Sequence, residues 1–347
     1  MTRSSPALSS SSSTATGSGG GAGAPSSYRR RASHAGTWYS SDKRQLGQQL
    51  SGWLEDARPL SESGHVRAII APHAGYSYSG PTAAYAYCHL DPERVSRVFV
   101  LGPSHHVHMR GCGVSTAAAL ETPVGDLEID QAVTAELVDT GLFEVLSPDV
   151  DEDEHSIEMH LPYIAKVMSG RRFTVVTIMV GSTSERQEEQ YGRLLAKYLE
   201  DPSNFFVVSS DFCHWGSRFR YQPHDPIRGE IHEYIRWLDH EGMALVQRQD
   251  VGGFYKYLAK HANTICGRHP IAVFMHAAGA ASGDFCVAWV RYAQSSRVVH
   301  KHDSSVSYAS AVITAVDDAA NGGGGSGGGG DGKRSAGAGL KRRASES

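Results

Sequence analysis

The chain has 347 residues, of which 40% are hydrophobic, and a formal net charge of −4 at pH 7. This length leaves room for one large domain or two joined halves. The acidic balance argues against nucleic acid as a partner, because phosphate binding requires a basic face. No apolar run approaches the roughly 18 residues of a membrane-crossing helix, so we expect no membrane span.

The two ends differ in composition from the middle. Residues 1–32 are mostly Ser, Gly, Ala and Arg, without Asp or Glu, and residues 317–347 contain two GGGG runs and the basic end KRRASES. Both ends have too few apolar residues to offset the entropy of ordering, so we predict a disordered Ser/Gly-rich tail and a disordered Gly-rich basic tail. Residues 33–316 are predicted to form a single α/β domain.

Five cysteines without a CxxC pair are typical of a reduced intracellular protein. We expect a cytoplasmic protein, with the nucleus as a second compartment. Targeting to an organelle is a minor alternative, because the N-terminal tail is rich in Ser, contains Arg and lacks acid. The sequence RRAS, which a basophilic kinase could recognise, occurs at 30–33 and at 342–345. It is a weak pattern, since short basic tails often contain it without regulation.

Apolar periodicity predicts alternating helices and strands. In chain order the predicted elements are helix 42–56, strands 66–71 and 97–101, helices 130–140 and 156–169, strand 173–180, helix 185–200, strand 205–210, helices 227–249, 252–262 and 270–281, and strands 284–293 and 306–315. Strands separated by helices indicate three layers around a central, mostly parallel sheet. Ser41, Asp42 and Asp130 are expected to cap the helices that they precede.

Polar clusters follow three of the predicted strands. RAIIAPHAGYSYSG at 67–80 leads into His73, RVFVLGPSHH at 97–106 into His105 and His106, and FFVVSSDFCHW at 205–215 into Asp211 and His214. The carboxyl ends of parallel strands share one edge of a sheet, where ligands bind. We therefore expect these side chains to meet, and Cys266 in NTICGRHP is a further candidate.

The chemistry of this cluster leaves alternatives open. A single strand-end histidine is by default a hydrogen-bonded structural residue, but three converging strand ends favour a shared site. Two imidazoles with one more ligand suit Fe(II), for which the usual third ligand is a carboxylate. Zinc or copper would accept histidine and thiolate equally well.

The segment DEDEHSIEMHLPY at 151–163 is not a metalloprotease helix, because its histidines are five residues apart and HExxH requires four. One interpretation is an amphipathic helix with solvated acids, in which Asp153 and Ser156 serve the first turn. In the other, Glu154, His155 or Glu158 reaches the strand-end site.

Eight stretches together resemble the eukaryotic Memo family, mediators of receptor-tyrosine-kinase-driven cell motility. They are SHAGTWY at 33–39, APHAGYSYSG at 71–80, LGPSHH at 101–106, DEDEHSIEMHLPY at 151–163, DPSNFFVVSSDFCHWGSRFRY at 201–221, NTICGRHP at 263–270, YAQSS at 292–296 and DSSVSYA at 303–309. The resemblance covers essentially all of residues 33–316, and only the tails fall outside it.

The resemblance implies a fold similar to that of class III extradiol dioxygenases, which hold non-heme iron with two histidines and a glutamate and use a further histidine as acid or base. It assigns His73 and His105 to the imidazole ligands, His214 to the acid/base position and Cys266 to the third ligand. Asp211, from the same strand end as His214, is the second candidate catalytic residue. A thiolate in place of the carboxylate favours copper or altered iron chemistry and puts catechol cleavage in doubt.

The resemblance also implies that the pocket, with Trp38, Tyr78 and His106, binds a phosphotyrosine peptide of a receptor kinase or adaptor. Two classes of function follow. The first is a metal-binding protein, with iron or copper, that acts in cell motility and cytoskeletal signalling and in metal or redox balance. The second is an active oxidoreductase with a small aromatic substrate. The cysteine favours the first, and the retained histidine and aspartate keep the second open.

Overall fold

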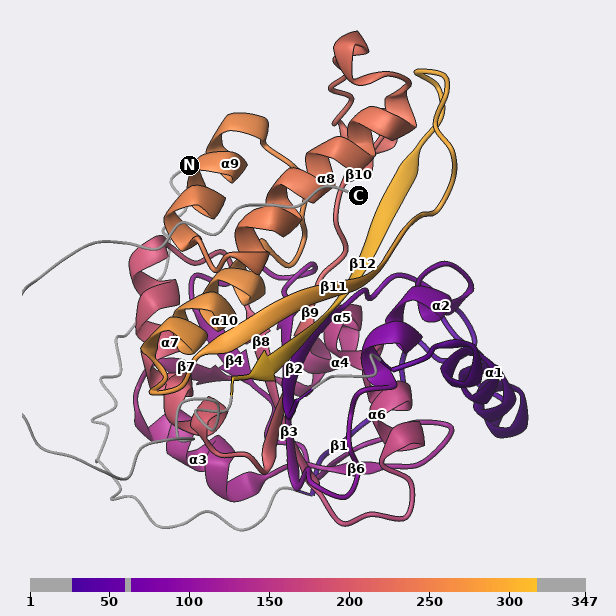
Figure 1. Cartoon of the computed structure of the whole chain (residues 1–347). Coiled ribbons are helices and arrows are strands. Elements are labelled where there is room, and N and C mark those ends of the chain that lie inside the picture. Colours follow the sequence, from indigo (N-terminus) through magenta and orange to yellow (C-terminus); the bar gives the residue numbers. More distant parts are fainter. Residues whose placement is uncertain (1–26, 60–63, 317–347) are drawn as a thin grey trace, which may run out of the picture.

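The computed structural model describes residues 27–59 and 64–316 (Figure 1). Most of the two predicted tails, residues 1–26 and 317–347, lies outside the described residues. The main sheet has the strand order β10-β12-β2-β9-β3-β8-β4-β7, with β11 paired to β12. Its strands are β2 (Val66–Ala71), β3 (Arg97–Pro103), β4 (Cys112–Val114), β7 (Phe143–Val145), β8 (Thr174–Val180), β9 (Asn204–Ser209), β10 (His214–Trp215), β11 (Phe285–Gln294) and β12 (Ser305–Ala315).

The centre of the sheet is parallel, as predicted. Strands β2, β9, β3 and β8 are neighbours and pair in parallel. The flanks are different, because β12 pairs antiparallel with both β2 and β11, and β4 pairs antiparallel with β8. Residues 295–304, which join β11 to β12, are too few for a helical crossover, so these two strands form a hairpin.

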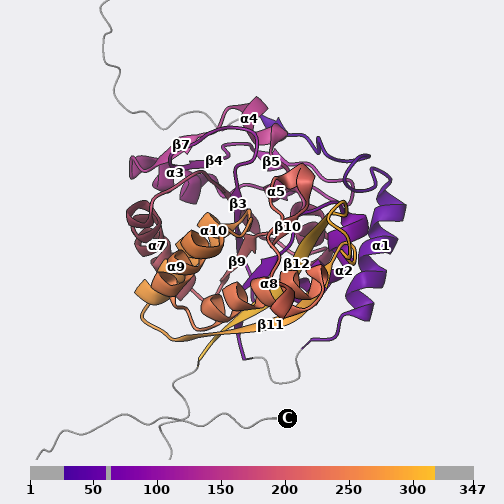
Figure 2. The same cartoon turned by 90° about the horizontal axis from the view of Figure 1, so that it is seen from above.

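Helices cover both faces of the sheet, which confirms the α/β class (Figure 2). Alternate residues of each central strand belong to different cores: Ala68 and Ile70 of β2 pack in one, and Ile69 and Ala71 in the other. The first core also contains residues of α3 (Gln131–Asp139), α7 (Glu185–Glu200), α8 (Ile231–Gln247), α9 (Val251–His261) and α10 (Arg268–Ala280). The second contains residues of α1 (Lys43–Asp56), α2 (Tyr76–Tyr87), α5 (His155–Glu158) and α6 (Leu161–Val167).

Two predicted caps are present, since the Asp42 side chain accepts from the Gln45 amide and that of Asp130 from the Val133 amide. Helix α2 escaped prediction because it contains Gly80 and Pro81, which are poor helix formers. The predicted helix 156–169 is two short helices, preceded by α4 (Pro148–Asp153). The 310 turns η1 (Ser217–Phe219) and η2 (Pro226–Arg228) precede α8. No helix in the described ranges is long and apolar enough to cross a membrane.

The N-terminal boundary of the domain lies earlier than predicted. Arg29 and Arg30 form strand β1, which pairs with β5 (Ala119–Leu120), and β5 pairs in turn with β6 (Leu127–Glu128). Arg30 is buried between Asp151 and Glu158. Composition assigned these residues to a tail, because the partners of Arg30 are more than a hundred residues away in the sequence.

Candidate functional site

Three neighbouring parallel strands deliver the predicted side chains to one edge of the sheet. His73 lies two residues beyond β2, Asp211 two residues beyond β9, and His105 two residues beyond β3. Since β9 lies between β2 and β3, these side chains meet, and the Asp211 carboxylate accepts a hydrogen bond of 2.9 Å from the His73 amide. The strand-end prediction is therefore correct in its geometry.

Cys266 comes to the same place from the loop before α10. Its Sγ lies 3.1 Å from His73 Nε2 and accepts a hydrogen bond of 3.2 Å from the Asp211 amide. The ligand atoms of His73, His105 and Cys266 all lie within 4.8 Å of one another. The next residue, Gly267, makes this approach possible, because a Cβ there would lie 2.3 Å from the Ser209 carbonyl oxygen.

Hydrogen bonds fix the tautomers of the two histidines. The Ser209 hydroxyl donates to the Ser156 carbonyl, so it accepts from His73 Nδ1, 2.6 Å away. His105 Nδ1 donates to the Glu154 carboxylate at 2.8 Å. In the neutral form of each ring, Nε2 is therefore the nitrogen without a proton, and this is the form in which imidazole binds a metal. Burial and the neighbouring histidines lower the pKa of His73, which keeps it neutral.

The role of Glu154 settles the interpretation of DEDEHSIEMHLPY. Its carboxylate caps α5 by accepting from the Ser156 amide and also accepts from the His105 amide. Burial alone would raise its pKa, but hydrogen bonding to His105 and the nearby imidazoles lower it to about 2. Glu154, not Asp153 or Ser156, caps the helix, and its buried carboxylate is not solvated.

His155 and Glu158 of the same segment point to different surroundings. His155 lines the pocket, with its ring centroid 4.4 Å from that of His105. Burial and the adjacent His105 lower the pKa of His155 to about 3. Glu158 instead accepts from Arg30, 2.7 Å away, and from the Tyr39 hydroxyl, and it does not line the pocket.

Asp211 and His214 complete the chemistry of the site. Burial raises the pKa of Asp211 to about 7. Burial, with the Asp211 carboxyl beside it, raises the pKa of the Cys266 thiol well above its usual value. His214 Nδ1 lies 2.9 Å from the Phe212 carbonyl and 3.1 Å from that of Thr264, so it is the protonated nitrogen. The Nε2 of His214 is therefore free to act as a base, and burial lowers the pKa of this ring.

His73, His105, Asp211 and His214 open into a cavity of about 800 Å³. It is lined by Trp38, His73, Ala74, Tyr78, His105, His155, Asp211, His214, Arg218, Phe219, Ser295, Ser296, Ser304, Val306 and Tyr308. The expected rim residues Trp38 and Tyr78 are among them. His106 is exposed and does not line the cavity, although its ring centroid lies 5.9 Å from that of His155.

Several residues of the site have no individual signal in the sequence. Arg218 and Phe219 follow the strand-end segment, and Tyr308 belongs to a long apolar strand. The stretches RFRY, YAQSS and DSSVSYA, which carry part of the family resemblance, contain these residues and the pocket serines. These stretches match the family although they do not follow a parallel strand. That match was the signal that could have assigned their residues to the pocket.

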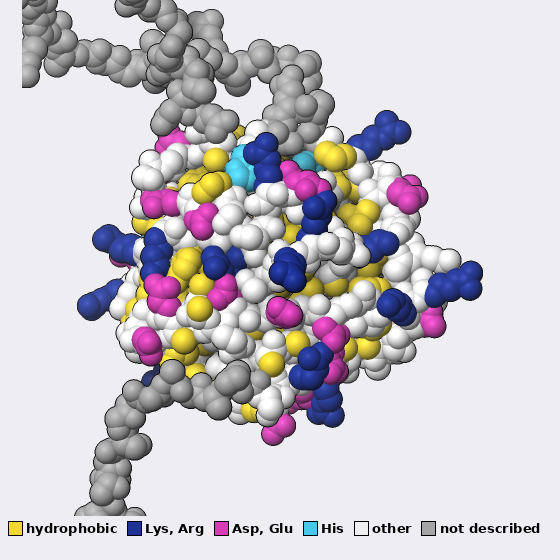
Figure 3. Space-filling view, turned by 90° about the horizontal axis from the view of Figure 1, so that it is seen from below, with side chains coloured by type: hydrophobic (Ala, Val, Ile, Leu, Met, Phe, Trp, Pro, Cys, Tyr) yellow, Lys and Arg dark blue, Asp and Glu magenta, His cyan; other side chains and the backbone are white. Residues whose placement is uncertain are grey.

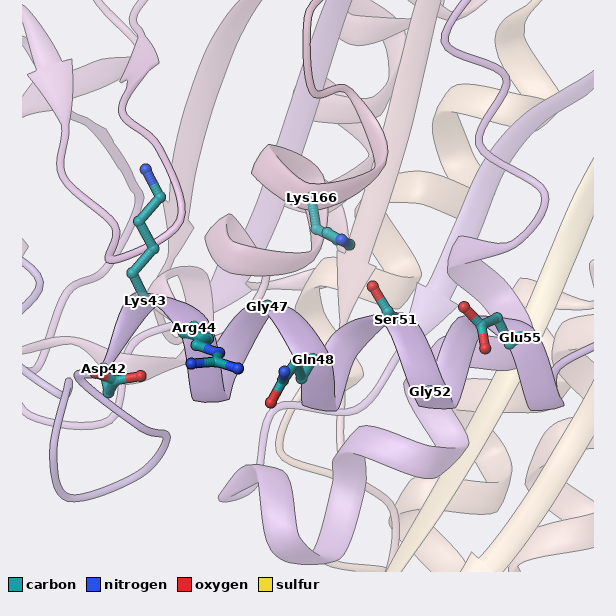
Figure 4. A pocket seen from close by; sticks show the side chains of 9 residues that line it. All are labelled: Asp42, Lys43, Arg44, Gly47, Gln48, Ser51, Gly52, Glu55 and Lys166. Atoms are coloured by element: carbon teal, nitrogen blue, oxygen red, sulfur yellow. The ribbon is translucent and has the colours of Figure 1, made fainter.

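A second hollow lies elsewhere, along α1 (Figure 4). Figure 4 shows Lys43, Ser51 and Glu55 along this helix, with Lys166 of α6 above them. No histidine or cysteine lines it. The face of the molecule in Figure 3 carries Lys and Arg interspersed with Asp and Glu, so neither positive nor negative charge predominates on that face. The strand-end pocket is the candidate site, because His73 and His105 line it and their ligand atoms lie within 4.8 Å of that of Cys266.

The family model and the similar proteins indicate the same family for this chain. Residues 30–312 match the family model for Memo-like proteins. The human and zebrafish (Danio rerio) proteins, each described as Protein MEMO1, are 50% identical, covering 82% of this chain and 97% of theirs. The Protein memo-1 homolog of Caenorhabditis elegans is 45% identical, covering 82% of both. A solved structure, the uncharacterized protein JW3007 from Escherichia coli K12, matches at 12% identity and a TM-score of 0.42, covering 71% of this chain and 99% of that one.

The fold and the pocket define a mixed α/β protein with histidines, an aspartate and a cysteine gathered at the carboxyl edge of its parallel strands. The chain belongs to the Memo-like family.

Proposed function

We propose that this protein binds iron or copper through His73, His105 and Cys266. The observation that carries the proposal is the convergence of a ring nitrogen of His73, a ring nitrogen of His105 and the sulfur of Cys266 within 4.8 Å, with each Nδ1 at hydrogen-bond distance from a partner. Such outer partners orient metal-binding histidines and increase their basicity. The residues present fit a metal with a preference for nitrogen and sulfur.

The sulfur ligand favours the softer metals. Because burial raises the pKa of Cys266, binding requires the charge of the cation to stabilise the thiolate and releases a proton. When bound, the metal would supply Lewis-acid and one-electron chemistry. The protein would exclude water from the buried side of the site and would hold a proton acceptor, His214 Nε2, in the pocket.

The test compares the metal affinity of variants that lack a proposed ligand with that of a variant that lacks His214, a pocket residue. Cys266→Ser should weaken Cu(I) and Fe(II) binding more than His214→Ala, because it removes a bond to the ion, whereas loss of an outer group costs about 10 to 100-fold in affinity. His73→Ala and His105→Ala should resemble Cys266→Ser. Affinities are measured anaerobically, with Cys286→Ser as the matched control because this cysteine is exposed and outside the cavity. Equal affinities for wild type and a folded Cys266→Ser would contradict the assignment and make Glu154 the candidate ligand.

The second candidate function is oxidation of a small aromatic substrate. It is supported by the free Nε2 of His214 and by Asp211, whose pKa near 7 allows it to exchange a proton near neutral pH. The iron-loaded protein is tested for oxygen uptake with a panel of catechols, beside His214→Ala. Turnover that is lost in this variant would establish the oxidoreductase. Its absence across the panel would leave the metal-binding function.

For a partner we propose a phosphotyrosine peptide from a receptor kinase or adaptor, which links the protein to cell motility in the cytoplasm. The family resemblance motivates this, and the pocket supports it by combining the aromatic rings of Trp38 and Tyr78 with the guanidinium of Arg218. Calorimetry with phosphorylated and unphosphorylated forms of one peptide tests it. Arg218→Ala should weaken only the phosphorylated form, and equal binding of both forms would refute the proposal.

A further inference from the structure

The N-terminal strap, defined here as residues 28–39, lies across the segment that carries Glu154 and His155. It begins with strand β1 and ends at the pocket, where the Trp38 ring packs against that of His155, with centroids 4.3 Å apart and the planes tilted by 30°. The backbone of the strap is bound to the domain at both ends, because the Tyr76 amide donates to the Trp38 carbonyl.

A buried carboxylate holds the middle of the strap. Glu158 is fully buried and accepts from Arg30 at 2.7 Å, from the His34 amide at 2.8 Å and from the Tyr39 hydroxyl at 2.7 Å. Three residues of the strap thus depend on one anion, so a second anion beside it would be strongly unfavourable.

Ser33 lies in that position. Ser33 is an exposed residue, and its hydroxyl points to the domain: it donates to the Glu152 carbonyl and lies 3.0 Å from a Glu158 carboxylate oxygen and 3.1 Å from His34 Nδ1. Ser33 is also the last residue of RRAS, in which Arg30 and Arg31 stand three and two positions before the serine. In the folded chain the side chain of Arg31 is 76% exposed, whereas that of Arg30 is 1% exposed.

We propose that Ser33 is a phosphorylation site whose modification releases the strap. A kinase that requires both arginines can bind only when Arg30 has left its ion pairs with Asp151 and Glu158. The kinase therefore modifies the chain while the strap is released. The Ser33 oxygen forms a bond to the γ-phosphorus of a nucleoside triphosphate, the β–γ phosphoanhydride bond breaks, the hydroxyl proton passes to the base of the kinase, and the nucleoside diphosphate leaves.

The phosphorylated strap cannot return to its place. The phosphate adds nearly two negative charges and three acceptor oxygens at a position that faces the Glu158 carboxylate and the Glu152 carbonyl oxygen. His34 Nδ1, the ring nitrogen beside the Ser33 hydroxyl, already lies 3.0 Å from the Glu158 carboxylate. Because Trp38 is five residues further along, release of the strap also frees the ring that covers His155. Phosphorylation would therefore open this wall of the pocket.

The test uses the full chain with Ser345→Ala, which removes the matching serine of the second RRAS. A basophilic kinase and ATP are added, phosphate at Ser33 is located by mass spectrometry, and amide exchange of the strap is measured. The His34 and Trp38 amides should exchange about tenfold faster or more after phosphorylation. Unchanged exchange after complete modification would overturn the proposal. So would the absence of phosphate at Ser33 when a peptide of residues 27–37 is fully modified.

Three substitutions separate charge from size. Ser33→Glu should accelerate exchange of the strap, whereas the neutral Ser33→Gln, which has the same shape, and Ser33→Ala should leave it nearly unchanged. Equal acceleration by Glu and Gln would show that bulk rather than charge displaces the strap, which would also overturn the proposal.

Discussion

At the scale of single residues, Asp211 carries an electrostatic penalty. Its carboxyl is buried, which raises the pKa from the ordinary 3.8 to about 7. Between these values the unfolded chain releases a proton that the folded chain retains, so stability falls as pH rises from about 4 to 7 and stays low above it. Asp211→Asn keeps an oxygen for the His73 amide without this penalty. The metal-free variant should be more stable than wild type by on the order of 2–4 kcal/mol at pH 8 and by much less at pH 4.5.

Urea denaturation at the two pH values measures this difference. Asp284→Asn is the control, because Asp284 is exposed. A gain for Asp211→Asn that is equal at both pH values would contradict the assigned ionisation.

Gly267 is a second residue with a specific requirement. An added Cβ would lie 2.3 Å from the Ser209 carbonyl oxygen and 2.4 Å from Ser210 Cβ, so Gly267→Ala must displace the loop of Cys266. We expect a loss of about 1–3 kcal/mol in unfolding free energy and weaker metal binding.

Gly279→Ala, near the other end of α10, is the comparison. No atom lies within 4 Å of a Cβ placed there, so this variant should gain about 0.5–1 kcal/mol. Thermal unfolding and Cu(I) affinity are measured for both variants. Similar behaviour of the two would show that the approach of the Cys266 loop to β9 is not constrained.

At the scale of elements, strand β1 joins the domain through Arg30. Removal of this cation leaves Asp151 and Glu158 buried without it, and breaking such a pair typically costs about 3–5 kcal/mol. A chain that begins at residue 27 should unfold at the same temperature as the full chain. A chain that begins at residue 36 should unfold at a distinctly lower temperature. Equal midpoints for the two truncations, measured by circular dichroism, would exclude a structural role of the strap.

At the scale of the whole molecule, the two hydrophobic cores lie on opposite faces of the same strands. Loss of either core would expose one face of β2, β3, β8 and β9, so the cores should unfold together. We expect coincident urea transitions by tryptophan fluorescence and by circular dichroism. Two separated transitions would argue for two domains.

The sequence by itself determined the central strands and the site that they carry. Continuous apolar runs are buried on both faces in a parallel sheet, which is why β2, β3 and β9 could be recognised and why His73, His105 and Asp211 could be expected at one edge. Cys266 has no such pattern, and only the family resemblance assigned it to the site.

Only the tertiary structure decided the supporting residues. Arg30 was assigned to a tail by composition, and the sequence left open whether Glu154 and His155 face solvent or the site. The burial of these charged and polar side chains depends on partners distant in the chain. The antiparallel pairing of β11 with β12 also escaped prediction, because an apolar run is the same for a parallel and an antiparallel strand. Local propensity and periodicity report on neighbours along the chain, whereas hydrogen bonds and ion pairs between distant segments exist only after folding.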